Sequence, residues 1–212
     1  MKKIIIIVGF LFIAMSSFAM DIDLGGKMGI GVGWWRGADY SKNVDVVGAA
    51  NATFGAFTSF ELHKNIAMQF ELLFAFIGNA DELKYKDYKL ERDYRNIAFE
   101  LPVYIKPKIE LGPGEMFFLI GPKFLILLDD FKVKHTSSKS SISHSSETDY
   151  RIGRQFHIGL AFGLGYELKL GPGKLQFSLN VTPYLTDYGK GYSDAVQNEA
   201  YLDVGYSYTF ED

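Results

Sequence analysis

The sequence predicts an all-β protein, an eight-stranded antiparallel up-and-down transmembrane β-barrel with short periplasmic turns and long extracellular loops. First, apolar residues alternate with small or polar residues over eight stretches, so each stretch would form a strand with two different faces. Second, most stretches are long enough to cross an apolar band of about 25 Å, at about 3.3 Å per residue and a tilt of about 45°. Third, short and long connections alternate along the chain, as in a barrel with tight turns on one side of a membrane and long loops on the other.

The first twenty residues have the layout of a secretory signal peptide. Lys2 and Lys3 form a basic end, residues 4–15 are apolar apart from Gly9, and small residues precede a cleavage site after Ala19. The apolar run is shorter than the roughly 20 residues that a membrane-spanning helix needs, which disfavours an uncleaved anchor. We therefore expect a signal peptide at residues 1–19 and one barrel domain at residues 20–212.

The predicted strands follow the alternation in chain order. In the first strand, Leu24, Met28 and Ile30 share one face, while Gly25 and Lys27 share the other. The predicted strands are residues 24–35, 51–62, 66–76, 94–106, 116–128, 155–168, 175–182 and 200–210. Three prolines fall within them or directly after one and remove ladder donors, so a bulge or a strand end is expected at Pro102, Pro122 and Pro183.

The connections are of two kinds. Residues 63–65 and two Gly-Pro-Gly segments, at 112–114 and 171–173, predict tight turns. Polar stretches predict long loops at residues 79–93, 129–150 and 187–198. The stretch 129–150 is the longest, with seven serines between Ser137 and Ser146, and it is the best candidate for a functional loop.

The polar faces of the strands are rich in small residues and carry charges, as a narrow eight-stranded lumen filled by side chains requires. Because charged groups face lipid only at a cost of roughly 2–4 kcal/mol, they are expected to point inward and form a closed salt-bridge network rather than an open pore. The predicted lumen charges are Lys27, Glu61, Glu71, Glu100, Lys106, Lys123, Glu167 and Asp203.

Aromatic residues cluster near the predicted strand ends, where amphipathic rings suit the headgroup boundary. This predicts an aromatic girdle at each rim. The outer rim would hold Trp34, Trp35, Tyr94 and Tyr184, and the inner rim Phe60, Tyr166, Tyr208 and Phe210.

Two segments resemble the PorT-like outer-membrane β-barrel family. They are residues 99–106, FELPVYIK, and residues 118–123, FLIGPK. That family carries a Glu-(Ile/Leu)-Pro strand that ends in Lys, followed by a hairpin and a Gly-Pro strand. The C-terminal segment 201–210 also resembles the strand that the barrel-assembly machinery recognises, although Glu211 and Asp212 follow the terminal Phe210. The resemblance implies a barrel in a bacterial outer membrane and names no catalytic residue.

Composition and motifs argue against several function classes. The 22 basic and 25 acidic residues leave no basic excess for nucleic acid, and the absence of cysteine removes disulfides and thiolate chemistry. No metal cluster, phosphate loop or nucleotide fingerprint is visible, so we expect no cofactor, no metal site and no enzyme activity. His157 falls on the predicted lumen face, and His144 with Ser145 lies in a serine-rich stretch typical of a solvated loop.

The sequence thus indicates a non-enzymatic integral outer-membrane protein with a structural or surface-interaction role through its extracellular loops. The expected partners are outer-membrane lipid, the barrel-assembly machinery during insertion, and a surface ligand or protein that the sequence does not identify. Two alternatives are a small pore for ions or apolar solutes and a membrane-embedded lipid hydrolase. A soluble lipocalin-like barrel, with the apolar faces inside, is the main structural rival.

Overall fold

We describe the protein from a computed structural model that covers residues 21–36, 44–85, 88–129, 131–139, 142–150, 154–187 and 196–210. Within these ranges the chain forms eleven strands in one antiparallel sheet, and no helix there is long and apolar enough to span a membrane. The expected signal peptide, residues 1–19, lies outside the described residues. The strands are β1 (Ile22–Arg36), β2 (Val44–Val47), β3 (Ala49–His63), β4 (Ile66–Tyr85), β5 (Tyr88–Leu111), β6 (Gly114–Leu127), β7 (Phe131–Lys139), β8 (Ile142–Tyr150), β9 (Phe156–Leu170), β10 (Gly173–Pro183) and β11 (Val196–Phe210).

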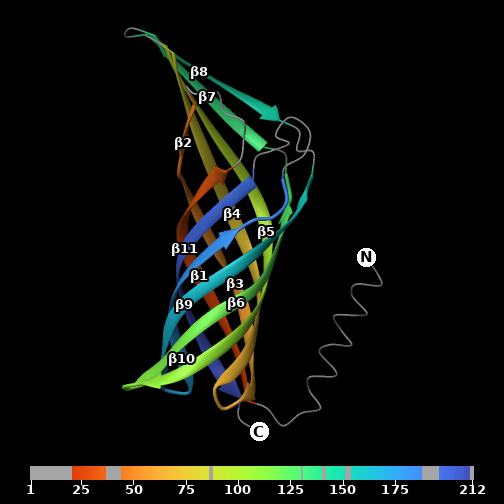
Figure 1. The fold of residues 1–212 in the computed structure, drawn as a ribbon, viewed down its shortest axis with the longest axis vertical. Helices are drawn as coiled ribbons and strands as arrows, with labels where there is room; N and C mark the ends of the chain where they lie inside the picture. The colour runs from red at the N-terminus through yellow and green to blue at the C-terminus, as the bar shows by residue number, and fades with distance from the viewer. Residues whose placement is uncertain are drawn as a thin grey trace.

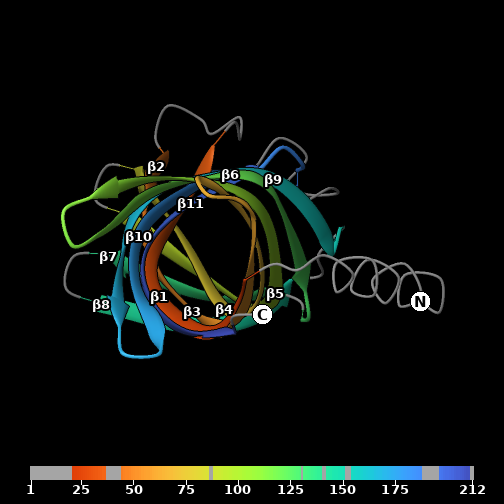
Figure 2. The same cartoon turned by 90° about the horizontal axis from the view of Figure 1, so that it is seen from below.

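Eight of these strands close into a ring, seen end-on in Figure 2. The order around the ring is β1, β3, β4, β5, β6, β9, β10 and β11. The last strand pairs with the first over their full lengths, from Ile22↔Phe210 to Arg36↔Val196, so the ring has no free edge. The predicted eight-stranded antiparallel barrel is confirmed.

Three tight turns lie at one end of the barrel, the turn end, where β11 also ends at Phe210 (Figure 1). Leu111 pairs with Gly114 and Leu170 with Gly173, so each Gly-Pro-Gly segment makes a two-residue hairpin loop. Gly112 and Gly171 both have a φ of 62°, the left-handed conformation that the first position of a type II′ turn requires. The third turn, Lys64–Asn65, follows a register shift between Glu61 and His63.

Replacing both turn glycines by alanine is expected to lower the free energy of unfolding by roughly 2 kcal/mol, about 1 kcal/mol at each left-handed position. The measurement is urea unfolding of the refolded barrel in detergent, followed by the loss of the fast-migrating band of the unheated protein on a denaturing gel. Gly26→Ala is the control, because a Cβ at Gly26 would have its nearest neighbour 3.6 Å away. An unchanged midpoint for the Gly112→Ala, Gly171→Ala protein would contradict the strain assigned to the turns.

The predicted loops at residues 79–93 and 129–150 are wrong as loops, because both segments contain paired strands. β4 and β5 continue beyond the ring as a ladder to Tyr85↔Tyr88, β7 pairs with β5, and β8 pairs with β7. β2 pairs with the far end of β4. We call these parts, residues 44–47, 79–85, 88–95, 131–139 and 142–150, the extension; it rises opposite the turn end (Figure 1). Main-chain hydrogen bonds form a ladder whatever the polarity of the side chains, so polar composition alone was a poor guide.

The outer face of the ring is an apolar belt. Large apolar side chains are exposed on every ring strand, with exposed fractions as high as 62% at Met28 and 71% at Ile30. On β5 the belt runs from Ile97 to Ile109, which at about 3.3 Å per residue and a tilt of about 45° rises about 28 Å. This height matches the apolar core that an outer-membrane barrel must cross.

The prolines inside the strands do not shift the pairing register. Pro102 pairs with Lys123 and Pro122 with Leu160, each in the same register as its neighbours, so the bulges expected there are absent from these two ladders. Pro183 lies at the last position of β10, a strand end as expected. Each proline therefore costs its ladder one donor without displacing the neighbouring side chains.

Candidate functional site

The interior of the barrel is polar and holds the predicted lumen charges. All eight occupy inward positions of their strands, and all except the half-buried Glu61 are buried. The structure adds five charged residues on the same inward face, Asp23, Lys108, Glu115, Lys174 and Glu199. Their alternation was visible in the sequence, since Lys108 lies two residues after Lys106 and Glu199 four before Asp203. The predicted strands were one or two residues too short to include them, at the start for four of the five and at the end for Lys108.

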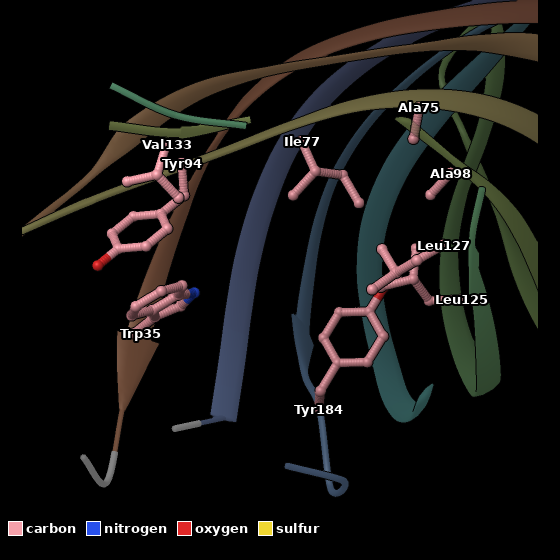
Figure 3. Packing of buried hydrophobic residues seen from close by; sticks show 9 residues of the cluster. All are labelled: Trp35, Ala75, Ile77, Tyr94, Ala98, Leu125, Leu127, Val133 and Tyr184. Atoms are coloured by element: carbon pink, nitrogen blue, oxygen red, sulfur yellow. The ribbon is translucent and has the colours of Figure 1, made fainter. Parts of the chain in front are cut away.

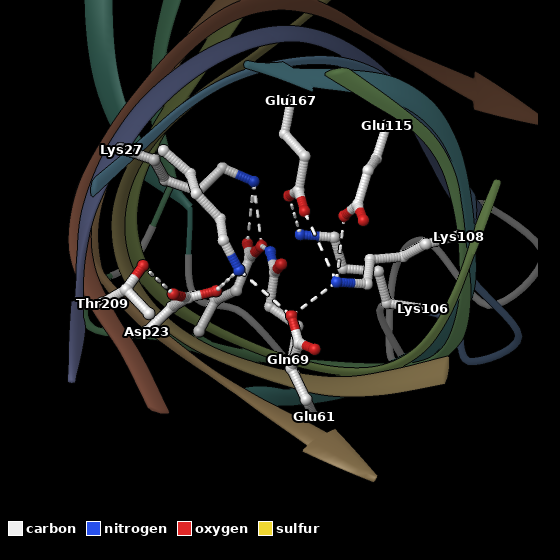
Figure 4. A network of polar contacts seen from close by, with 11 residues as sticks. Asp23, Lys27, Glu61, Gln69, Lys106, Lys108, Glu115, Glu167 and Thr209 are labelled. Atoms are coloured by element: carbon white, nitrogen blue, oxygen red, sulfur yellow. Dashed lines mark hydrogen bonds and ion pairs between the residues drawn. The ribbon is translucent and has the colours of Figure 1, made fainter. Parts of the chain in front are cut away.

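At the turn end, two lysines of β5 each lie against carboxylates from other strands (Figure 4). Lys108 Nζ is 2.5 Å from Glu61 Oε1 and 3.0 Å from Glu115 Oε2. Lys106 Nζ is 2.5 Å from Glu167 Oε2 and also lies 4.3 Å from the ring centroid of Phe117. These contacts join β3, β5, β6 and β9 across the lumen.

A third lysine completes the turn-end layer on the opposite wall. Lys174 Nζ is 3.0 Å from Asp23 Oδ2 and 3.1 Å from Glu61 Oε1. Thr209 donates a hydrogen bond of 2.7 Å to the other oxygen of Asp23. Glu61 is thus shared between Lys174 and Lys108, so one carboxylate links the two halves of this layer.

The middle of the lumen is crossed by Lys27. Its Nζ lies 2.9 Å from Glu71 Oε1 and 3.6 Å from Asp203 Oδ2, which come from different strands. Gln69 donates a hydrogen bond of 2.6 Å to Glu71, and Asn180 donates one to Asp203. The lysine therefore bridges β1 to β4 and β11.

Towards the extension, Lys123 lies between two fully buried glutamates. Its Nζ is 2.6 Å from Glu100 Oε2 and forms a second, shorter ion pair with Glu199. Tyr184 donates a hydrogen bond of 3.0 Å to Glu199, and the Lys123 ammonium lies 5.0 Å from the ring centroid of Tyr201. Three successive layers of ion pairs therefore cross the lumen.

Above these layers, apolar side chains join polar ones such as Asn96 and Gln197 on the inward face. Figure 3 shows the cluster, in which Val133 from the extension packs with Trp35, Tyr94 and Ile77 at the barrel mouth. The rings of Trp35 and Tyr94 have centroids 4.4 Å apart. The base of the extension is thereby packed onto the ring.

The outer-rim girdle is wrong for three of its four residues. Trp35, Tyr94 and Tyr184 are 3%, 1% and 0% exposed and belong to the interior cluster, whereas Trp34 is half-buried. The physical reason is the strand alternation, which places Trp35 on the same face as Lys27, and Tyr94 on the same face as Glu100. Position at a rim does not decide the direction of a side chain.

At the turn end, all four predicted girdle residues lie at outward positions of their strands, and three of them are exposed or half-buried there. Tyr208 and Phe210 are half exposed, with ring centroids 4.9 Å apart, and Tyr166 donates a hydrogen bond of 2.7 Å to the carbonyl of Leu111. Phe60 is buried at its outward position, where it packs edge-on against Phe70 beside the register shift at Glu61.

The histidine considered for hydrolysis, His157, is buried at an inward position of β9. Its Nε2 lies 3.0 Å from the carbonyl oxygen of Arg154 and its Nδ1 3.3 Å from Thr186 Oγ1. The side chains of His135 and His144 lie outside the described residues, so the pairing of His144 with Ser145 is not tested. Within the described residues, no group of three or more His, Asp or Glu could hold a metal ion.

The comparisons with known proteins agree with this architecture. The family model for the outer membrane protein β-barrel domain matches residues 16–188. The chain belongs to the outer membrane protein β-barrel domain family. No curated protein matches the sequence.

Among solved outer-membrane barrels, OprG shares the fold, and NspA and Ail match less closely. The outer membrane protein OprG from Pseudomonas aeruginosa has a TM-score of 0.54 and 13% identity, over 92% of this chain and 97% of that chain. The neisserial surface protein NspA has a TM-score of 0.46 and 8% identity, over 88% and 97%. The attachment invasion locus protein Ail of Yersinia pestis has a TM-score of 0.38 and 12% identity, over 90% and 100%. Family and fold together identify an integral β-barrel protein of the bacterial outer membrane.

Proposed function

We propose that this outer-membrane barrel is a non-enzymatic, non-conducting scaffold that presents its extension at the cell surface for interaction with a ligand or protein. The observation that carries the proposal is the continuation of ring strands β4 and β5 into the extension. A surface built on paired strands is held rigidly by the barrel, as a recognition surface requires.

The lumen supports the non-conducting part of the proposal. Eight strands enclose an interior that side chains can fill, and here three layers of ion pairs and an apolar cluster fill it. We expect no stepwise conductance when the purified protein is added to planar lipid bilayers. Discrete conductance steps would favour the alternative of a small pore.

One observation favours that alternative. The buried side-chain nitrogen and oxygen of Asn79, where β4 enters the extension, have no hydrogen-bond partner among the described residues. Buried polar atoms of this kind are usually satisfied by water or a solute, so the upper lumen is the part that a small polar solute would enter.

Surface presentation has a direct test. An epitope inserted between Lys139 and Ile142, in the β7–β8 hairpin, is expected to bind antibody on intact cells. The same epitope between Gly112 and Gly114 should bind only after the outer membrane is permeabilised. The reverse pattern would overturn the proposal, because the extension would then face the periplasm.

Three further statements belong to the proposal. The segments 99–106 and 118–123 support a PorT-like branch of the family, cleavage after Ala19 would release the mature barrel, and the C-terminal strand would be recognised by the barrel-assembly machinery. N-terminal sequencing of the protein from the membrane fraction tests the cleavage: we expect Met20 as the first residue.

A further inference from the structure

A groove of about 740 Å³ lies on the outward face, where β3 begins at Ala49 and the extension starts. Small residues line it on two neighbouring segments. Gly48 lies just before β3 and Ala50 at its start, and Gly78 and Ala80 lie beside them on β4. A Cβ at Gly78 would lie 2.7 Å from the carbonyl oxygen of Ala50, so that position keeps the two segments in close approach. The outward surface is therefore hollow at this point because its side chains are small.

The groove opens onto the apolar belt. Phe76 of β4 and Ile97 of β5 line it, and each is the last large apolar residue on the outward face of its strand before the extension. Phe76 is 47% exposed. An acyl chain lying against the belt could therefore continue into the groove without crossing a polar surface.

Two exposed basic residues lie next along the groove. Arg95 is two residues beyond Ile97 on β5, and it pairs directly with Lys132 of β7 in the ladder. Like charges directly opposite each other on one face of a sheet are destabilising. Among the described residues neither side chain forms an ion pair, so an anion between them would relieve the repulsion.

Two acidic residues lie close to this basic pair, Asp93 beyond it along β5 and Asp129 beside Asn96. Asp93 lies two residues beyond Arg95, and Asp129 lies at the link between β6 and β7; both line the groove. Asp93 is opposite Lys134 in the ladder, but within the described chain no ion pair joins them. Along β5, from the apolar belt towards the extension, the outward residues are first apolar, then basic, then acidic. This order matches the acyl chain, phosphate and ammonium of a phosphoethanolamine lipid.

We propose that this groove binds one lipid with a phosphoethanolamine headgroup. Its phosphate lies between Arg95 and Lys132, its ammonium faces Asp93 and Asp129, and an acyl chain lies along Phe76 and Ile97. The proposal rests on the proposed function only for the location of the extension at the membrane surface.

The test is native mass spectrometry of the refolded protein in a non-ionic detergent with dioleoyl phosphatidylethanolamine or dioleoyl phosphatidylglycerol. We expect one phosphatidylethanolamine to be retained in preference to phosphatidylglycerol. Arg95→Gln with Lys132→Gln should lower retention of both lipids on the order of 10-fold, since two charges that attract phosphate are lost. Asp93→Asn with Asp129→Asn should remove only the preference for the ethanolamine headgroup.

Two further variants separate the groove from general charge effects. Lys64→Gln with Lys169→Gln removes the same charge from exposed positions at the turn end and should leave retention unchanged. Ala50→Phe fills the groove without altering its charges and should abolish retention. All variants are first checked for the heat-dependent gel shift of a folded barrel.

Equal retention by the wild-type and the Arg95→Gln, Lys132→Gln proteins would overturn the proposal. Displacement of the lipid by an equal concentration of inorganic phosphate would also overturn it, by showing a site for free phosphate. Because the assay is made in detergent, it does not depend on which side of the membrane the extension faces, so failure of the epitope test is distinguishable.

Discussion

Lys123→Met is expected to lower the free energy of unfolding by about 3–5 kcal/mol, because it leaves two buried carboxylates without their shared cation. Glu100 and Glu199 are both 0% exposed, and the ammonium group of Lys123 contacts both carboxylates. The measurement is the urea midpoint of the unheated gel band in detergent. With an effect of this size, part of the protein is expected to fail to refold.

Two variants show whether the charge is responsible. Adding Glu100→Gln and Glu199→Gln to Lys123→Met removes the uncompensated charges, so much of the lost stability should return. Lys64→Ala breaks the exposed ion pair with Glu110, whose side chains are 75% and 73% exposed, and should change stability by less than about 1 kcal/mol. A Lys123→Met protein as stable as Lys64→Ala would refute the view that this layer holds the barrel closed.

Sequence alternation was sufficient to predict the ring because the two faces of a barrel wall meet different environments, lipid outside and a polar lumen inside. Wherever outward lipid-facing residues such as Met28 alternate with inward residues such as Lys27, the period of two is strong. Beyond Phe76 and Ile97 the outward residues are polar or small, so the contrast disappears although the ladder continues. The extension was missed for that reason.

The same contrast explains why the inward direction was predicted for the charged residues and not for Trp35 and Tyr94. Charge excludes a side chain from lipid, so the inward direction of Glu71 and Glu100 follows from chemistry as well as from parity. Tryptophan and tyrosine tolerate both environments, so chemistry left the direction of Trp35 and Tyr94 open. Parity alone would have placed both inside. The partners of each lysine depend on which strands face one another across the lumen, and alternation along one strand carries no such information.

Gly165→Leu is expected to destabilise the barrel by about 1–3 kcal/mol or more through overpacking of the lumen. Gly165 is an inward position of β9, and a Cβ there would lie 2.2 Å from Cζ of the Phe117 ring and 2.5 Å from the carbonyl oxygen of Phe177. Phe117 is fully buried and lies under the Lys106 ammonium, so it has no free space to move into. The urea midpoint in detergent is again the measurement.

A double-mutant cycle identifies the clash. Phe117→Ala alone should cost about 3–5 kcal/mol, because it leaves a cavity beneath Lys106. If the ring occupies the space above Gly165, the combined Gly165→Leu, Phe117→Ala protein should be more stable than the sum of the single losses, by about 1–3 kcal/mol. Gly26→Leu is the matched control on the lipid face, where the nearest atom to a new Cβ is 3.6 Å away and no loss is expected. Additive losses in the cycle would mean that glycine at position 165 is not needed to make room for Phe117. The small residues of the lumen wall would then not be explained by larger side chains filling a narrow barrel.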